Sequence, residues 1–211
     1  MSQADTKQRI LDAAEELFAR NGFHGTSLRT ITGKAGVNLA AVNYHFGSKE
    51  ALIEAVFERR LTPLNSLRME RLEAVRQRAE RESSAPDVRR TLLAFIEPTM
   101  MFREAGEGSR NFIVLVGRVL AEPDETVRMM FVEQIRPVFL FLFEILCRAL
   151  PGQNRELLFW RLQFALGAIS HTLCWMGRFP ALAQGLEPPQ DAATLTDWLL
   201  DFITAGMENK G

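Results

Sequence analysis

The sequence contains few of the residues that cross-link small domains or build metal centres. Its 211 residues include two cysteines, Cys147 and Cys174, and three histidines. Both cysteines lie in apolar stretches with a helical pattern, which indicates buried thiols in a reducing compartment and argues against a disulfide framework. Neither His24 nor His171 belongs to a cluster of ligands with the spacing of a metal site, so we expect no metal and no cofactor.

The sequence also lacks a large charge of one sign and a long uninterrupted apolar run. The formal net charge is −1, so any binding of nucleic acid must depend on a local patch rather than on the whole surface. The longest apolar stretches are interrupted by Arg, Glu or Gly, and the first residues contain no apolar signal segment. We therefore expect no membrane span and a cytoplasmic location.

Alternating polar and apolar residues, which are typical of strands, are almost absent, whereas apolar residues recur at the helical period of about 3.6. This pattern predicts an all-α fold. Helices are predicted before Gly22, over residues 27–35, over residues 39–46 and from Ser48 onwards, with a bend at Pro63. The tight turn between the second and third helices predicts a helix-turn-helix.

The segment 36–52 reads GVNLAAVNYHFGSKEAL and places polar groups on the third predicted helix. In a helix-turn-helix the second helix enters the major groove of DNA, while helix starts and polar side chains hold phosphates. The predicted phosphate contacts are Asn38, Tyr44, His45 and Lys49. The predicted base contacts are Leu39 and Ala40 with thymine methyl groups and Asn43 with adenine. The alternative is a solvated helix surface and, for His45 alone, a capping or packing role.

The predicted third helix has no Arg or Lys, so the reading of guanine would fall to Arg29 or Lys34. We find no paired carboxylates and no nucleophile with a base at helical spacing. The sequence therefore predicts no catalytic residue and no enzyme.

Residues 6–57 resemble the TetR family of bacterial transcription regulators, through ILDAAEELFARNGFHGTSLRTITGKAGVNLAAVNYHFGSKEALIEAVF. A looser similarity, in VLVGRVLAEPD and FVEQIRPVF, is to the branch of fatty-acid-responsive pseudomonad repressors. The resemblance implies about nine helices, a DNA-binding domain over residues 1–50 and a ligand-binding and dimerisation domain over residues 51–211. It adds Thr26 to the phosphate contacts. Many members have Tyr at the position of Asn43, so base preference does not transfer.

The C-terminal part contains many aromatic residues, which indicates an apolar ligand pocket as well as ordinary packing. The predicted pocket residues are Arg118, Gln134, Phe139, Phe143, Gln163 and His171. For Arg118 the alternative is an ion pair with Glu122. The resemblance implies a homodimer built on the last two helices, and we expect the interface at Leu157, Trp160, Phe164, Ala168, Leu195, Trp198 and Phe202.

These expectations combine into a homodimeric regulator that binds a double-stranded DNA operator. It would most simply be a repressor that is released by a small, mostly apolar effector such as a fatty acid or acyl-CoA. Two alternatives remain open at this point: a non-specific architectural DNA-binding protein, and a transcriptional activator of the same fold. The nearly balanced charge of the first fifty residues argues against the architectural protein.

Overall fold

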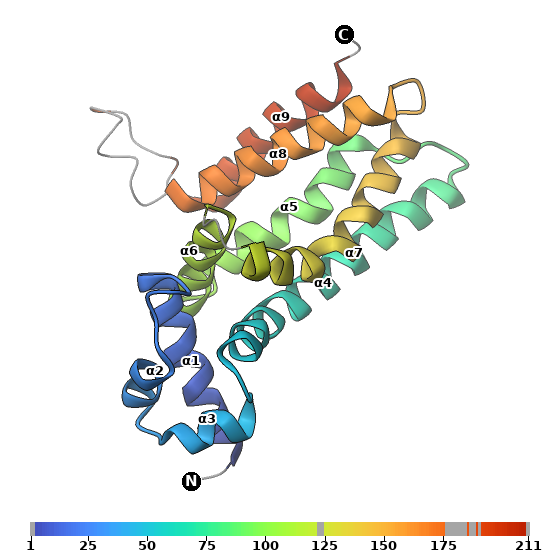
Figure 1. Ribbon diagram of the computed structural model, residues 1–211. Coiled ribbons are helices and arrows are strands. Elements are labelled where there is room, and N and C mark those ends of the chain that lie inside the picture. Colours follow the sequence, from blue (N-terminus) through green and yellow to red (C-terminus); the bar gives the residue numbers. More distant parts are fainter. Residues whose placement is uncertain (1–2, 122–124, 176–184, 186–188, 190, 210–211) are drawn as a thin grey trace. The chain divides into compact units, whose positions relative to one another are not determined.

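The computed structural model describes residues 3–121, 125–175, 185, 189 and 191–209. Within these ranges the chain forms nine α-helices and no strand (Figure 1). The all-α fold predicted from the periodicity is therefore confirmed, and the number of helices is the one that the resemblance implies. The same residues contain no helix that is long and apolar enough to cross a membrane. The helices are α1 (Gln3–Asn21), α2 (Leu28–Ala35), α3 (Leu39–His45), α4 (Lys49–Arg81), α5 (Val88–Glu104), α6 (Glu107–Ala121), α7 (Glu125–Ala149), α8 (Arg155–Trp175) and α9 (Ala192–Glu208).

Local sequence explains the short helices near the N-terminus. The Ser27 side chain accepts a hydrogen bond from the backbone N–H of Thr30 and so caps α2 at its start. Gly36 ends α2 in the left-handed conformation, with φ of 63°, which a glycine adopts without strain. The Asn38 side chain then caps α3 by accepting from the N–H of Ala41 at 2.9 Å. These three residues produce the predicted helix-turn-helix.

The chain forms two compact units. The first contains residues 1–63 and 104–135, and the second contains residues 64–103 and 136–211. These limits differ from the predicted domains of 1–50 and 51–211, because α6 packs on α1 and so joins the N-terminal helices. The helix α4 continues through Pro63, where the first unit ends, and contributes to both units.

The core of the first unit is built around Phe57 of α4. Its ring meets Phe112 of α6 edge to face at 6.3 Å and Phe131 of α7 at 5.8 Å between ring centroids. Phe18 of α1 and Ile31 of α2 are fully buried in the same unit. This apolar packing holds the two helices of the helix-turn-helix on a fixed support.

The core of the second unit consists of apolar side chains from α4, α5, α7, α8 and α9. Leu92, Leu142, Leu162 and Leu200 are among its most deeply buried members. The helices α8 and α9 pack side by side (Figure 1). Asp191 caps the start of α9, and its hydrogen bonds from Thr194 lower the pKa of that carboxyl.

Candidate functional site

The helix α3 presents a row of unburied side chains on the outer side of the helix-turn-helix. Val42 is fully buried and anchors the helix, as its apolar character predicts. Leu39, Ala40 and Asn43, the predicted base contacts, are exposed. A short helix held by one apolar anchor can place its remaining side chains in a major groove without any change of the core.

The predicted phosphate contacts border this row. Tyr44 is 73% exposed, and its ring stands edge to face against that of His45, which is half-buried. Asn38 is exposed although its side-chain oxygen is used in the cap of α3, so its amide N–H groups remain available to an acceptor. The structure thus places Asn38, Tyr44 and His45 on the same short segment as the predicted base contacts.

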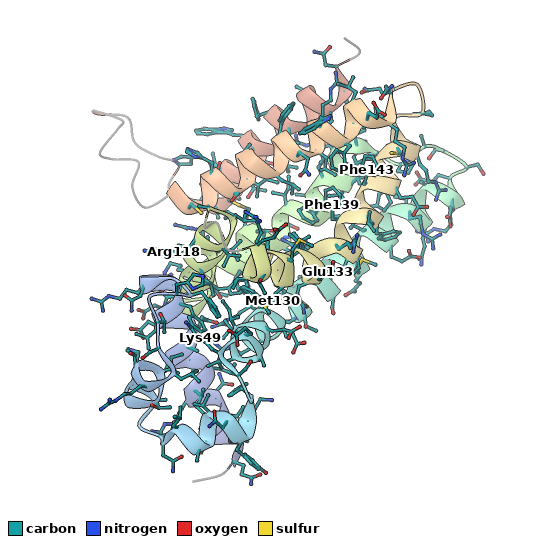
Figure 2. The ribbon with its side chains drawn as sticks, in the orientation of Figure 1. Lys49, Arg118, Met130, Glu133, Phe139 and Phe143 are labelled. Atoms are coloured by element: carbon teal, nitrogen blue, oxygen red, sulfur yellow. The ribbon has the colours of Figure 1, made fainter. Side chains whose placement is uncertain are left out.

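Lys49 begins α4 and is labelled in Figure 2. Its ammonium lies 4.2 Å from the centroid of the Phe23 ring, a distance typical of a cation–π contact. Partial burial lowers the pKa of Lys49, while the neighbouring Glu50 raises it. The aromatic ring therefore holds the lysine in place at the start of the helix, where it can meet a phosphate.

Thr26 does not fit the phosphate contact that the family resemblance implies. It is only 1% exposed, and its hydroxyl donates to the carbonyl oxygens of Gly22 at 2.8 Å and Leu17 at 3.1 Å. A buried hydroxyl engaged in this way stabilises the turn after α1 and cannot reach a phosphate. Its exposed neighbour Ser27 is the side chain that reaches the surface at this point.

The two cations considered for guanine differ in their surroundings. Arg29 is exposed on α2. Lys34 forms an ion pair of 2.7 Å with Glu16 of α1, and this pair competes with any base for the ammonium. Arg29 is therefore the better candidate of the two.

Polar contacts attach the helix-turn-helix to α1. The guanidinium of Arg9 donates to the carbonyl oxygens of Ala35 and Gly36, which are at the C-terminal end of α2. A cation at this end of a helix satisfies carbonyl groups that have no partner within the helix. The orientation of α2 on α1 is thus fixed by hydrogen bonds as well as by apolar packing.

Comparisons with known proteins also identify a helix-turn-helix in the N-terminal part of the chain. Residues 10–56 match the bacterial regulatory proteins of the tetR family, and residues 93–206, more than half of the chain, match the tetracyclin repressor-like C-terminal domain. The chain belongs to the TetR family. It is a helix-turn-helix transcription regulator of this family.

Three relatives illustrate the family. UidR of Escherichia coli K12 is 45% identical over 51 residues, or 24% of this chain and 26% of UidR. SrpR of Pseudomonas putida is 43% identical over 60 residues, or 28% of each chain. These matches span only about a quarter of the curated relatives. The solved structure of FadR from Bacillus subtilis in complex with stearoyl-CoA has a TM-score of 0.70 at 18% identity, and the match covers 94% of this chain and 98% of that chain. At this identity it shows the TetR fold alone.

The predicted pocket residues are divided between the two units. Arg118 and Gln134 belong to the first unit, whereas Phe139, Phe143, Gln163 and His171 belong to the second. Gln163 and His171 are exposed on α8. Phe139 and Phe143 of α7, labelled in Figure 2, stack at 6.4 Å and both meet the ring of Phe159 edge to face.

Arg118 contacts the first unit's own backbone. Its guanidinium donates to the carbonyl oxygen of Arg20, near the end of α1, at 3.0 Å. Glu122, the ion-pair partner considered for it, lies outside the described residues. Arg118 thus joins α6 to α1 through this hydrogen bond.

Most of the predicted interface residues on α8 and α9 are large apolar side chains that this chain alone does not cover. Ala168 and Leu195 are half-buried, and the others are exposed: Leu157, Trp160, Phe164, Trp198 and Phe202. The rings of Trp160 and Phe164 lie 6.3 Å apart on one face of α8. A contiguous patch of this kind on a globular protein marks a surface that binds another molecule.

One charged residue of the second unit escaped the sequence analysis. Arg68 of α4 is 6% exposed and lies among apolar groups. The signal was present, because Leu64 precedes it by four residues and Leu72 follows it by four, so helical spacing puts all three on one face. Among the described residues no group of three His, Cys, Asp or Glu side chains could hold a metal ion.

Proposed function

We propose that this TetR regulator is a homodimeric repressor that leaves its operator when a mostly apolar effector binds to the second unit. The proposed dimer is supported by the exposed apolar surface of α8 and α9, which includes Trp160, Phe164, Trp198 and Phe202. Burial of these apolar side chains against a second copy removes them from water, which stabilises the dimer. An isologous pair of the same two helices forms a closed four-helix interface.

The dimer supplies the geometry that operator binding requires. Two recognition helices must lie about one turn of DNA apart, ~34–36 Å, to enter successive major grooves. Each copy offers one α3, with Leu39, Ala40 and Asn43 toward the bases and Asn38, Tyr44, His45 and Lys49 toward the phosphates. Phosphate contacts fix the position on the duplex, while the base contacts select the sequence.

The helix α4 provides a covalent connection for the response. It runs without interruption from Lys49, beside the helix-turn-helix, to Arg81 in the second unit. An effector that binds better to one conformation of the second unit shifts the population of the whole dimer toward it. If that conformation changes the separation of the two α3 helices, the operator is released.

We propose a fatty acid or its acyl-CoA ester as the effector. The support is the similarity to FadR, whose solved structure holds stearoyl-CoA, together with the apolar and aromatic side chains of the second unit, Phe139, Phe143 and Phe159 among them. We propose that the effector pocket lies within that unit and includes Phe139, Phe143 and the polar candidates Gln163 and His171. We also propose that the protein belongs with the fatty-acid-responsive pseudomonad repressors.

Fluorescence anisotropy tests the proposal. The purified protein first selects its preferred duplex from a random library, and the labelled duplex is then titrated with acyl chains of four to eighteen carbons. Each buried methylene contributes ~0.8 kcal/mol, which is roughly a fourfold gain in potency, until the chain fills the pocket. A flat response over the series contradicts the acyl effector. Equal affinity for the selected duplex and random DNA contradicts the repressor, and an increase of operator affinity with the effector contradicts release.

A further inference from the structure

In the second unit the buried guanidinium of Arg68 has no negatively charged partner among the residues that the structure describes. The Arg68 guanidinium on α4 donates from Nη1 to the Asn65 side-chain oxygen at 2.9 Å and from Nη2 to the Thr99 hydroxyl at 2.6 Å. Both acceptors are neutral. Within the described part of the chain no carboxylate lies within ion-pair distance of this group, and its buried Nε–H donates no hydrogen bond.

The neighbouring charges are already paired. Arg71, one turn further along α4, forms an ion pair with Glu97 of α5. The carboxylate of Glu97, two residues before Thr99 on α5, therefore pairs with Arg71 and not with Arg68. Burial lowers the pKa of Arg68 to about 10, so the guanidinium is still protonated at neutral pH.

A buried cation without a counter-ion lowers the stability of a protein, and an apolar side chain of similar size in its place is often neutral or stabilising. Such a group needs another reason to be present, and unsatisfied buried charges are characteristic of binding sites. The Arg68 side chain is also held rigidly, because its guanidinium lies 4.3 Å from the centroid of the Phe95 ring. The guanidinium is thus held in a fixed orientation, and its Nε–H is available to an acceptor.

The surroundings define the chemistry of the missing partner. A guanidinium with free N–H groups on Nε and its terminal nitrogens matches a carboxylate, which accepts two parallel hydrogen bonds. With Arg71 engaged, a single positive charge is available, so a single negative charge neutralises it. Apart from Thr99, the buried side chains in this part of the core include the apolar Leu72, Phe95 and Met100.

We propose that Arg68 binds the carboxylate of the effector, and that the effector is therefore a free apolar carboxylic acid rather than its CoA ester. This inference rests on the proposed function, since it assigns the polar end of the same ligand. A CoA ester has no carboxylate at the acyl end, and its several phosphates exceed the one charge that Arg68 offers. The inference places the charged contact at Arg68 and not at Arg118, which the sequence suggested as a pocket residue.

Calorimetric titration of the full-length protein tests the assignment. The probes are dodecanoate, methyl dodecanoate, dodecyl phosphate and dodecanoyl-CoA, below their micellar concentrations. We expect dodecanoate to bind tightest, and Arg68→Met to weaken it roughly 10- to 150-fold, the range for hydrogen bonds to a charged group, while methyl dodecanoate changes little. Arg71→Met is the matched control, because it removes a cation of the same helix that already has a partner, and it should keep the preference for the acid.

Urea unfolding without ligand distinguishes binding from a structural role. If Arg68 serves the ligand, Arg68→Met unfolds at the same or a higher urea concentration than the natural protein. If Arg68 only supports the fold, the variant unfolds earlier and loses acid and ester affinity equally, which overturns the proposal. Tighter binding of the phosphate or the CoA ester than of the acid also overturns it, although an acyl effector still stands. Failure of all four probes, with selective DNA binding intact, overturns both the acyl effector and the role of Arg68.

Discussion

Arg60 of α4 and Glu15 of α1 form a two-pronged ion pair in the first unit, with Nε to Oε2 at 2.7 Å and Nη2 to Oε1 at 2.6 Å. Arg59 adds a third contact to Glu15 Oε2 at 2.7 Å. The carboxylate is almost completely buried, and a Cβ on Gly108 of α6 would lie 2.2 Å from Arg60 Nη2. The pair therefore joins α1 to α4 at a point where a side chain in place of Gly108 of α6 would have to displace the Arg60 guanidinium.

Replacement of Glu15 should destabilise the protein strongly. Glu15→Gln leaves two partly buried guanidinium groups without their shared carboxylate, and removal of one partner of a buried pair costs about 3 kcal/mol or more. Urea unfolding measures the change. Asp12→Asn is the control, because this carboxylate also binds Arg59 but is 59% exposed, and its loss should cost less than about 1 kcal/mol. Equal effects of the two changes would show that burial of Glu15 is unimportant.

A second charge pair makes the stability of α4 dependent on pH. Hydrogen bonds from Arg76 and Gln77 lower the pKa of Glu73 to about 2. Because the pKa is lower in the folded state than the ordinary value of 4.5, the stabilisation is complete above pH 4.5 and disappears as the pH falls toward 2. The natural protein should unfold later than Glu73→Gln at neutral pH, with the difference vanishing near pH 2. The effect should be small and weakened by salt, and a difference that grows on acidification would contradict it.

The role of Lys49 can be tested on DNA. If its ammonium contacts a phosphate, Lys49→Ala weakens binding to the selected operator and to random duplex about equally, and it reduces the salt slope by about one unit. Asn43→Ala is the contrasting variant, because loss of a base contact costs ~1–3 kcal/mol on the operator and little on random DNA. Unchanged affinity of Lys49→Ala at low salt would remove this residue from the interface.

The fold could be predicted because its signals are local. Ser27, Gly36 and Asn38 cap or end helices through their own side chains or backbone freedom, so each boundary is visible in a few neighbouring residues. The exposed residues of α3 could be predicted for a similar reason. Val42 is the one apolar anchor of α3, and a single buried position determines which other positions remain outside.

The errors concern contacts between residues distant in the sequence. Thr26 is polar, but its hydroxyl is buried against the carbonyl of Leu17, which only tertiary structure reveals. Arg118 lies in an apolar run that suggests a pocket, yet it reaches back to Arg20. The compact units differ from the predicted domains because α6 packs on α1, more than eighty residues earlier, and no local pattern encodes that contact. Arg68 is a different case, since its helical spacing was readable.

The proposed dimer can be tested by one charge on its surface. Phe202 is 70% exposed in the single chain, so Phe202→Glu should leave the fold intact, while a dimer would have to bury the new carboxylate without a partner. Sedimentation at micromolar concentration should then show monomers, and operator binding should fall because one α3 reads only half of the site. Leu140→Glu is the control, since this exposed apolar residue of α7 lies outside the predicted interface and should leave the dimer unchanged. A natural protein that sediments as a monomer under these conditions would rule out the α8–α9 interface.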